Sequence, residues 1–207
     1  TLAPALAGLG IIASVLSIFV VRTKEGASLA QLLKSLHAGV WASSALILLG
    51  SAGLLWFTLG EVESVVWWRI WIAIFAGLIS GLVIAWGTEF YTSYEKPPTQ
   101  RISKQAEMGP ATVIIAGIAE GMKSTWIPLI TVVVTILIAF VAAGGTDTFL
   151  MGVFGVGIAA VGMLSTLGIT LATDAYGPIA DNAGGNAEMT QQEPYVRERT
   201  DMLDSLG

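Results

Sequence analysis

The amino-acid sequence predicts an all-α fold, a polytopic bundle of five transmembrane helices, on two observations. Hydrophobic residues make up 54% of the 207 residues and charged residues only 12%, which is typical of a membrane protein with several spans and not of a soluble globular domain. The apolar residues also form five runs, and about 20 residues in a helix suffice to cross a bilayer. We therefore expect a single membrane domain over residues 1–207.

The first two expected spans cover residues 2–21 and 37–59. Ser14 and Ser17 are the only polar interruptions of the first. Small residues recur along the second, and small side chains let neighbouring helices approach closely within a membrane. They are Ala42, Ser43, Ser44, Gly50, Ser51 and Gly53.

The third and fourth expected spans cover residues 65–90 and 110–142. Three tryptophans open the third span, as expected where aromatic rings lie at the level of the lipid headgroups. Pro110 suits the first position of a helix, and Pro128 predicts a kink further along because it has no backbone N–H to donate. The tryptophans are Trp67, Trp68 and Trp71.

The fifth expected span covers residues 149–173 and is unusually rich in glycine, with Gly152, Gly155, Gly157 and Gly162, which suits a helix in a crowded interior. Loop charges predict the orientation: acidic residues lie in the turns after the second and fourth spans, and basic residues lie in the other two connections. By the positive-inside rule the basic connections are cytoplasmic, so residues 174–207 should emerge in the cytoplasm from the cell's inner membrane. The acidic residues are Glu61, Glu63 and Asp147; the basic ones are Arg22, Lys24, Lys34, Lys96, Arg101 and Lys104.

Three acids recur every seven residues after the fifth apolar run: Asp174, Asp181 and Glu188. In a helix they would share one face, with roughly 10 Å between neighbours. Pro178 and the glycines at 184 and 185 instead predict a kinked helix end that leads into an acidic, Gly-rich loop. Carboxylate ligands, with no cysteine in the chain, favour a hard cation such as Mg²⁺.

A second charged pair lies inside the fourth expected span. Glu120 and Lys123 are three residues apart and so share one helix face. Charges within a membrane span should face protein or water instead of lipid. Both an internal salt bridge and a place in an ion path fit this pair.

The string DAYGPIADNAGG, followed by AEM and then VRERTDMLDSLG, resembles the membrane-integral pyrophosphatases, which hydrolyse inorganic pyrophosphate and pump H⁺ or Na⁺. Asn186 departs from the aliphatic residue of many members. The resemblance implies a homodimer whose subunits each have sixteen helices in two concentric rings. This chain would supply about the seventh to the eleventh of these, as a fragment of a longer chain.

The resemblance also implies the site residues. Asp181 is expected to bind magnesium, and Asp174 is expected to be a second functional acid one level deeper. The acids that activate the attacking water lie outside this chain, so the segment alone should be inactive. Mg²⁺ is the expected cofactor, with K⁺ as a further one. Candidates for the shell around metal and substrate are Asn182, Glu188, Asp201 and Asp204.

Two other classes of protein stay open on the residues. One is a non-catalytic membrane scaffold that keeps the motif, and the other is a cation channel or secondary transporter lined by Glu120, Lys123 and Asp174. A net charge of −5 and the lack of a basic stripe argue against nucleic acid as a partner. The expected partners are pyrophosphate, membrane lipids and the transported ion.

Overall fold

The computed structural model describes residues 2–24, 26–62 and 65–206, and over these ranges all regular structure is helical. Glu63 and Gly207, which belong to the predicted acidic turn and the predicted cytoplasmic motif, lie outside the described residues. The chain forms two compact units, Thr1–Leu54 with Leu164–Gly207 and Leu55–Met163. The predicted all-α fold is confirmed.

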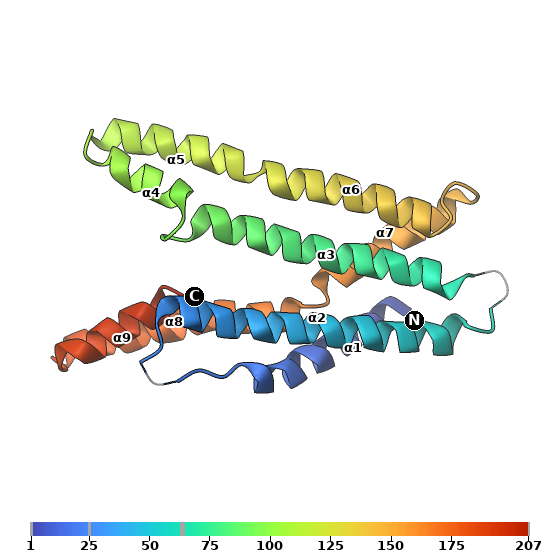
Figure 1. The fold of residues 1–207 in the computed structure, drawn as a ribbon, viewed down its shortest axis with the longest axis horizontal. Coiled ribbons are helices and arrows are strands. Elements are labelled where there is room, and N and C mark those ends of the chain that lie inside the picture. The colour runs from blue at the N-terminus through green and yellow to red at the C-terminus, as the bar shows by residue number, and fades with distance from the viewer. Residues whose placement is uncertain (1, 25, 63–64, 207) are drawn as a thin grey trace. The chain divides into compact units, whose positions relative to one another are not determined.

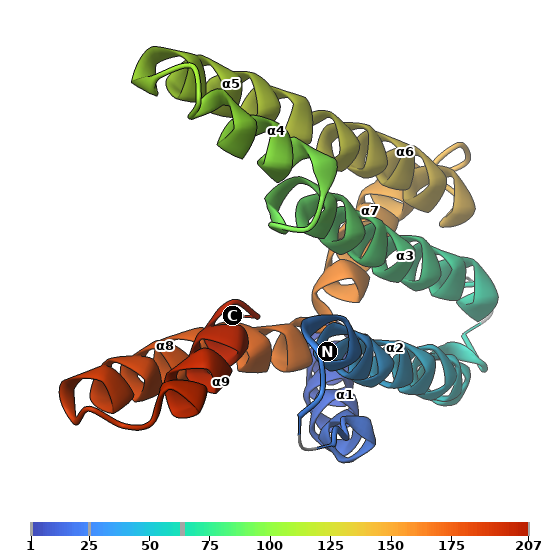
Figure 2. The same ribbon diagram turned by 60° about the vertical axis from the view of Figure 1, so that its left-hand side comes forward.

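The first unit is built from α1 (Leu2–Ser17), the short 3-10 helix η1 (Ile18–Val20), most of α2 (Leu29–Leu59), α8 (Leu167–Met189) and α9 (Pro194–Asp204). Helix α8 packs against α9 and α1, and Figure 2 shows α8 and α9 side by side. Close contact with α1 depends on glycine, because a Cβ on Gly168 would lie 2.9 Å from the Ser14 hydroxyl.

Helix α2 begins at Leu29, eight residues before the expected second span. The earlier start has a local cause at Ser28. The Ser28 backbone N–H donates to the Gln31 side chain over 3.0 Å, and the Gln31 N–H donates to the Ser28 carbonyl over 2.9 Å. This resembles half of a capping box, in which a Gln side chain satisfies a backbone donor at the helix start. Residues 29–36 therefore continue the helix.

The second unit contains α3 (Trp67–Thr92), α4 (Pro97–Gln105), α5 (Pro110–Ser124), α6 (Trp126–Ala142) and α7 (Phe149–Leu164). Helix α3 lies along α6, as Figure 1 shows. Ala73, Ala139 and Ala159 from α3, α6 and α7 form a buried cluster, and Val156 packs against it. These three helices meet through small side chains.

Proline places two of the helix boundaries. The chain breaks at Thr125 between α5 and α6, four residues after Gly121 and three before Pro128. Because Pro128 has no N–H, the Ser124 carbonyl loses its usual helical donor, which accounts for the interruption, and a change of direction at Pro128 stays a prediction. Helix α4 begins at Pro97, since proline fits the first turn of a helix.

Four helical stretches are long and apolar enough to cross a membrane within the described ranges: Leu2–Val20, Leu29–Leu59, Trp67–Gln105 and Pro110–Ala142. The expected fifth span, residues 149–173, is instead a bent pair, because α7 ends at Leu164 and α8 begins at Leu167. Counted as one span, the pair makes five. The intervening Ser165 and Thr166 are residue types that compete with the helix backbone for hydrogen bonds and so favour helix ends.

Candidate functional site: the acidic face of helix α8

The acidic stretch is helical up to Met189, so the predicted acidic, Gly-rich loop was wrong, whereas a kink of the helix at Pro178 stays a prediction. Helix α8 runs without a break from Leu167 to Met189 and contains Pro178. Proline removes one helical hydrogen bond, the one to the Asp174 carbonyl. The Asn182 amide nitrogen donates to the Pro178 carbonyl over 2.6 Å, which adds a bond to the turn that follows. The helix tolerates its proline with this local support.

Asp174, Asp181 and Glu188 are exposed and, on a continuous helix, share one face with about 10 Å between neighbours. The Asp181 side chain makes no hydrogen bond or ion pair with the described part of the chain. Asp174, at the membrane end of the row, is likewise without a partner among the described residues. Two of the three carboxylates are therefore available to a ligand.

Arg197 on α9 binds groups at the other end of this acidic face. One of its terminal nitrogens donates to the Gly184 carbonyl and to the Glu188 carboxylate, both over 2.8 Å. Its Nε pairs with the Asp201 carboxylate over 2.7 Å, one turn further along α9. Arg197 thus joins α8 to α9 and neutralises charge at Glu188 and Asp201. Sequence reasoning missed this role, because Arg197 lies 9 and 13 residues from its α8 partners.

The charges around Arg197 also act on its ionisation. The hydrogen bond to Asp201 is the main reason why the pKa of the Arg197 guanidinium is raised above its ordinary value. The negative charges of Glu188 and Asp181 raise it further. The neighbouring carboxylates therefore favour the charged form of the Arg197 guanidinium.

The turn between the two helices brings α9 back along α8. Gln191 takes a positive φ of 54°, and the Gln192 N–H donates to the Ala187 carbonyl over 3.0 Å. Pro194 then starts α9. Because the chain reverses here, Thr200 and Arg197 come to lie over Gly184.

Replacing Gly184 and Gly185 separately by alanine should distinguish the two glycines. A Cβ on Gly184 would lie 3.3 Å from the Thr200 hydroxyl, whereas a Cβ on Gly185 would meet nothing within 4 Å. Gly185→Ala should stabilise the helix by about 0.5–1 kcal/mol, and Gly184→Ala should forfeit this gain by pushing α9 away. The measurement is the rate of proteolytic cleavage at residues 190–193, expected to rise in Gly184→Ala alone. Equal rates in both variants would contradict the packing.

Two of the remaining predicted site residues lie at the edges of the cluster. The Asn182 nitrogen is used on the Pro178 carbonyl, which leaves its amide oxygen as the atom that could reach a ligand. Asp204 is the last residue of α9 and is exposed. It makes no ion pair within the part of the chain that the structure describes. Neither side chain forms a hydrogen bond or ion pair with Asp181 in the described part of the chain.

The donors fit Mg²⁺ in kind, since Asp174, Asp181 and Asn182 offer oxygen atoms. Their spacing, however, lets only one of the two carboxylates bind any one metal ion. Mg²⁺ binds oxygen at about 2.0–2.1 Å, so carboxylates about 10 Å apart on one helix cannot share one ion. No group of three or more His, Cys, Asp or Glu residues converges on a metal position among the described residues. A complete magnesium shell needs oxygens from the substrate, from water or from other helices.

Glu120 forms ion pairs with two basic residues, Lys123 and Arg101. The Glu120 Oε1 atom accepts from Lys123 Nζ over 3.3 Å and from Arg101 Nε over 3.0 Å. Glu120 is 7% exposed, and its Oε2 atom has no partner in the described structure. Arg101 lies on α4, so this cluster ties the short α4 to α5. The structure therefore shows a salt bridge, and a role in an ion path stays a prediction.

The family described as "Inorganic H+ pyrophosphatase" matches residues 1–207. A protein of Bacteroides thetaiotaomicron named "Putative K(+)-stimulated pyrophosphate-energized sodium pump" is 54% identical over 204 residues, 98% of this chain and 27% of the relative. The "K(+)-stimulated pyrophosphate-energized sodium pump" of Thermotoga maritima is 39% identical over 210 residues, with the same shares.

A relative from Methanosarcina mazei carries a different name, "K(+)-insensitive pyrophosphate-energized proton pump". It is 37% identical over 198 residues, which are 95% of this chain and 28% of the relative. The chain thus spans just over a quarter of the length of these three curated relatives. Similar sequences occur in pumps named for either ion.

Proposed function

Because this chain belongs to the inorganic H⁺ pyrophosphatase family, we propose that the protein hydrolyses magnesium pyrophosphate to two phosphates and couples this to pumping of H⁺ or Na⁺. The observation that carries the proposal is the family match over the whole chain, with the exposed, unpaired Asp181 in its acidic motif. The helices and the relatives support a multi-pass membrane protein. The acidic motif would face the cytoplasm.

Asp181 is the residue we assign to magnesium binding, with Asp174 as the second acid one level deeper. Bound Mg²⁺ would neutralise charge on the phosphate oxygens. Asp181 can offer its carboxylate without first breaking a bond, because it has no partner in the described part of the chain. Arg197 is a positioning residue: it holds Glu188 and Asp201 and keeps α9 beside the acidic face. Asn182 and Asp204 would complete the polar shell.

The proposal concerns the longer protein, and this segment alone should not hydrolyse pyrophosphate. Magnesium ligands and water-activating acids must come from elsewhere, since α8 and α9 supply too few converging carboxylates. The relatives' names give both K⁺-stimulated and K⁺-insensitive pumps, so K⁺ is proposed as a stimulating ion only. We also propose that the protein is a homodimer, because the family that it resembles is homodimeric.

The test is an assay of the full-length protein in sealed vesicles. Phosphate release from added pyrophosphate should require Mg²⁺, and uptake of H⁺ or Na⁺ should require pyrophosphate. Ion uptake without pyrophosphate would instead identify a passive channel, and absence of hydrolysis would identify a scaffold. The 207-residue segment, reconstituted in the same way, should release no phosphate.

A further inference from the structure

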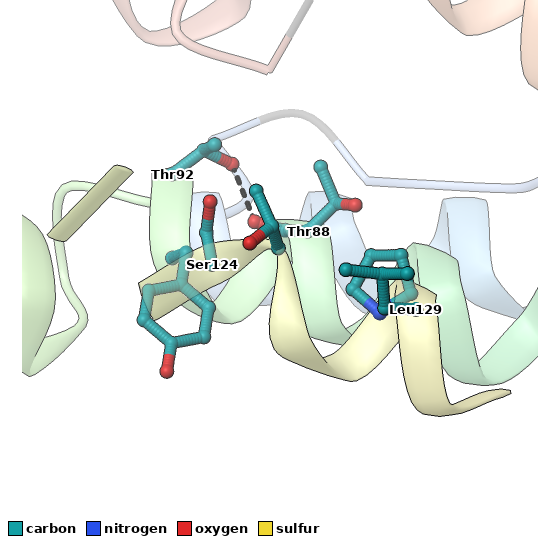
Figure 3. A pocket seen from close by; sticks show the side chains of 7 residues that line it. Thr88, Thr92, Ser124 and Leu129 are labelled. Atoms are coloured by element: carbon teal, nitrogen blue, oxygen red, sulfur yellow. Dashed lines mark hydrogen bonds between the residues drawn. The ribbon is translucent and has the colours of Figure 1, made fainter. Parts of the chain in front are cut away.

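The second unit contains a hydroxyl-lined pocket that the proposed function does not use. It lies where α5 ends and α6 begins, against the last turns of α3, and has a volume of about 320 Å³. Pro128 and Leu129 form its apolar side, and Figure 3 shows Thr88, Thr92 and Ser124 together with Leu129 around it. Five side chains contribute hydroxyl groups to the lining: Thr88, Tyr91, Thr92, Ser124 and Thr125.

Most of these hydroxyls have already donated their protons to the backbone. Thr88 donates to the Ile84 carbonyl and Thr92 to the Thr88 carbonyl, each over 2.9 Å. Ser124 and Thr125 donate to carbonyls three residues earlier, over 2.7 and 2.8 Å. A hydroxyl that donates its proton keeps its oxygen lone pairs. The pocket therefore offers hydrogen-bond acceptors.

The break in the helix adds a further acceptor. Pro128 has no N–H, so it cannot supply the helical hydrogen bond to the Ser124 carbonyl four residues earlier. Tyr91, which also lines the pocket, accepts a hydrogen bond from the Trp126 indole over 3.2 Å. A group with several N–H donors would satisfy these oxygens better than an anion would.

Positive charge lies beside the same end of the helices. Arg101 and Lys123 share one oxygen of Glu120, and their side chains are 57% and 60% exposed. Two cations against one carboxylate leave a surplus of one positive charge. Lys123 directly precedes Ser124 of the pocket, and the α4 residue Thr99 donates to the Tyr91 carbonyl over 3.4 Å. A bound molecule could thus meet acceptors and, beside them, cations.

We propose that this pocket binds the phosphoethanolamine headgroup of a membrane lipid. The primary ammonium donates to the hydroxyl oxygens, and the phosphate pairs with Arg101 and Lys123. The acyl chains lie on α6, whose Leu129 and Val133 are 62% and 52% exposed. Trp86 and Trp126, also exposed, are the ring type that lies at headgroup level. A choline headgroup fits less well because its quaternary nitrogen has no N–H.

The test compares three phospholipids with identical acyl chains, carrying ethanolamine, choline or glycerol headgroups. Full-length protein in detergent is incubated with each, and the lipid retained per protein is counted by mass spectrometry. We expect retention of the ethanolamine lipid to exceed that of the choline lipid by about tenfold, the effect of a hydrogen bond to a charged group. Equal retention of these two lipids would overturn the proposal.

Three variants locate the preference. In the double variant Thr88→Val and Thr92→Val, ethanolamine retention should fall to the choline level. Thr131→Val, on α6 just outside the pocket lining, should keep the wild-type preference. Arg101→Gln should lower retention of all three lipids. An unchanged preference in the double variant would contradict the assignment. The same result is expected if another segment of the longer protein fills the pocket.

Two controls complete the test. One distinguishes a lipid from a soluble ligand, and the other distinguishes loss of the binding site from loss of folding. Free phosphoethanolamine should displace the lipid only at much higher concentration, because it lacks acyl chains. If free phosphoethanolamine displaces the bound lipid at the same concentration as added ethanolamine lipid does, the pocket binds soluble amines and the lipid proposal is wrong. Each variant's thermal unfolding midpoint must match wild type. Lipid retention is read without turnover, so this proposal can fail while the pyrophosphatase proposal stands.

Discussion

Replacing Asp181 by Asn in the full-length protein should lower the rate of pyrophosphate hydrolysis about a hundredfold or more. A metal ion at a phosphoryl group supplies several kcal/mol of charge stabilisation, and each 1.36 kcal/mol is about tenfold in rate. The amide keeps the size of the side chain but loses its charge. Stability should change little, since Asp181 is exposed and without a bonded partner in the described chain. Phosphate release and thermal unfolding, measured on the same preparation, check both expectations.

Asp147→Asn is the matched control for this prediction. Asp147 lies in the turn between α6 and α7, and the same loss of one charge there should leave hydrolysis at the wild-type rate. Added Mg²⁺ should partly restore Asp181→Asn, because weaker binding is compensated by concentration. If Asp181→Asn hydrolyses pyrophosphate as fast as wild type, the motif is not a metal site and the scaffold interpretation gains.

Replacing Gly77 by Ala should destabilise the second unit by about 2–3 kcal/mol, at the upper end of what overpacking of a core costs. A Cβ on Gly77 would run into the backbone carbonyl of Ala159 on α7. A backbone atom cannot rotate away as a side chain can. The neighbouring Ala73, Ala139 and Ala159 are almost fully buried, so the helices would have to separate and lose contacts throughout the cluster.

Gly117→Ala on α5 gives the opposite expectation. Nothing lies within 4 Å of its Cβ position, so alanine should stabilise the helix by up to about 1 kcal/mol. The thermal unfolding midpoint of the full-length protein should fall in Gly77→Ala and hold or rise in Gly117→Ala. Equal midpoints would mean that α3 and α7 do not touch at this glycine.

Sequence reasoning succeeded where one residue's own chemistry decides the structure. Pro128 breaks a helix because it lacks a donor, and apolar runs of sufficient length form helices that can span a membrane. It failed at residues 174–189, where Pro178 and two glycines predicted a loop. There the Asn182 amide and the packing of Gly184 under α9 outweigh local propensity, and neither can be read from a window of sequence.

Ion pairs across distant residues were beyond prediction for the same reason. Glu120 was paired with its neighbour Lys123, but Arg101, 19 residues away, was not foreseen as a partner. Arg197 had no predicted role, although it makes three bonds around the acidic face. Sequence spacing indicates which residues share a helix face, whereas the return of α4 to α5 and of α9 to α8 depends on turn geometry.

The unbroken course of α8 from Leu167 to Met189 has a mechanical consequence. A helix with a complete ladder of hydrogen bonds is stiff along its axis and would carry a displacement at Asp181 to Asp174 almost undiminished. Pro178 removes one rung of that ladder, and the missing rung is the one that starts at the Asp174 carbonyl. The most compliant point of α8 therefore lies between the two acids, where bending would absorb part of any push from the Asp181 end.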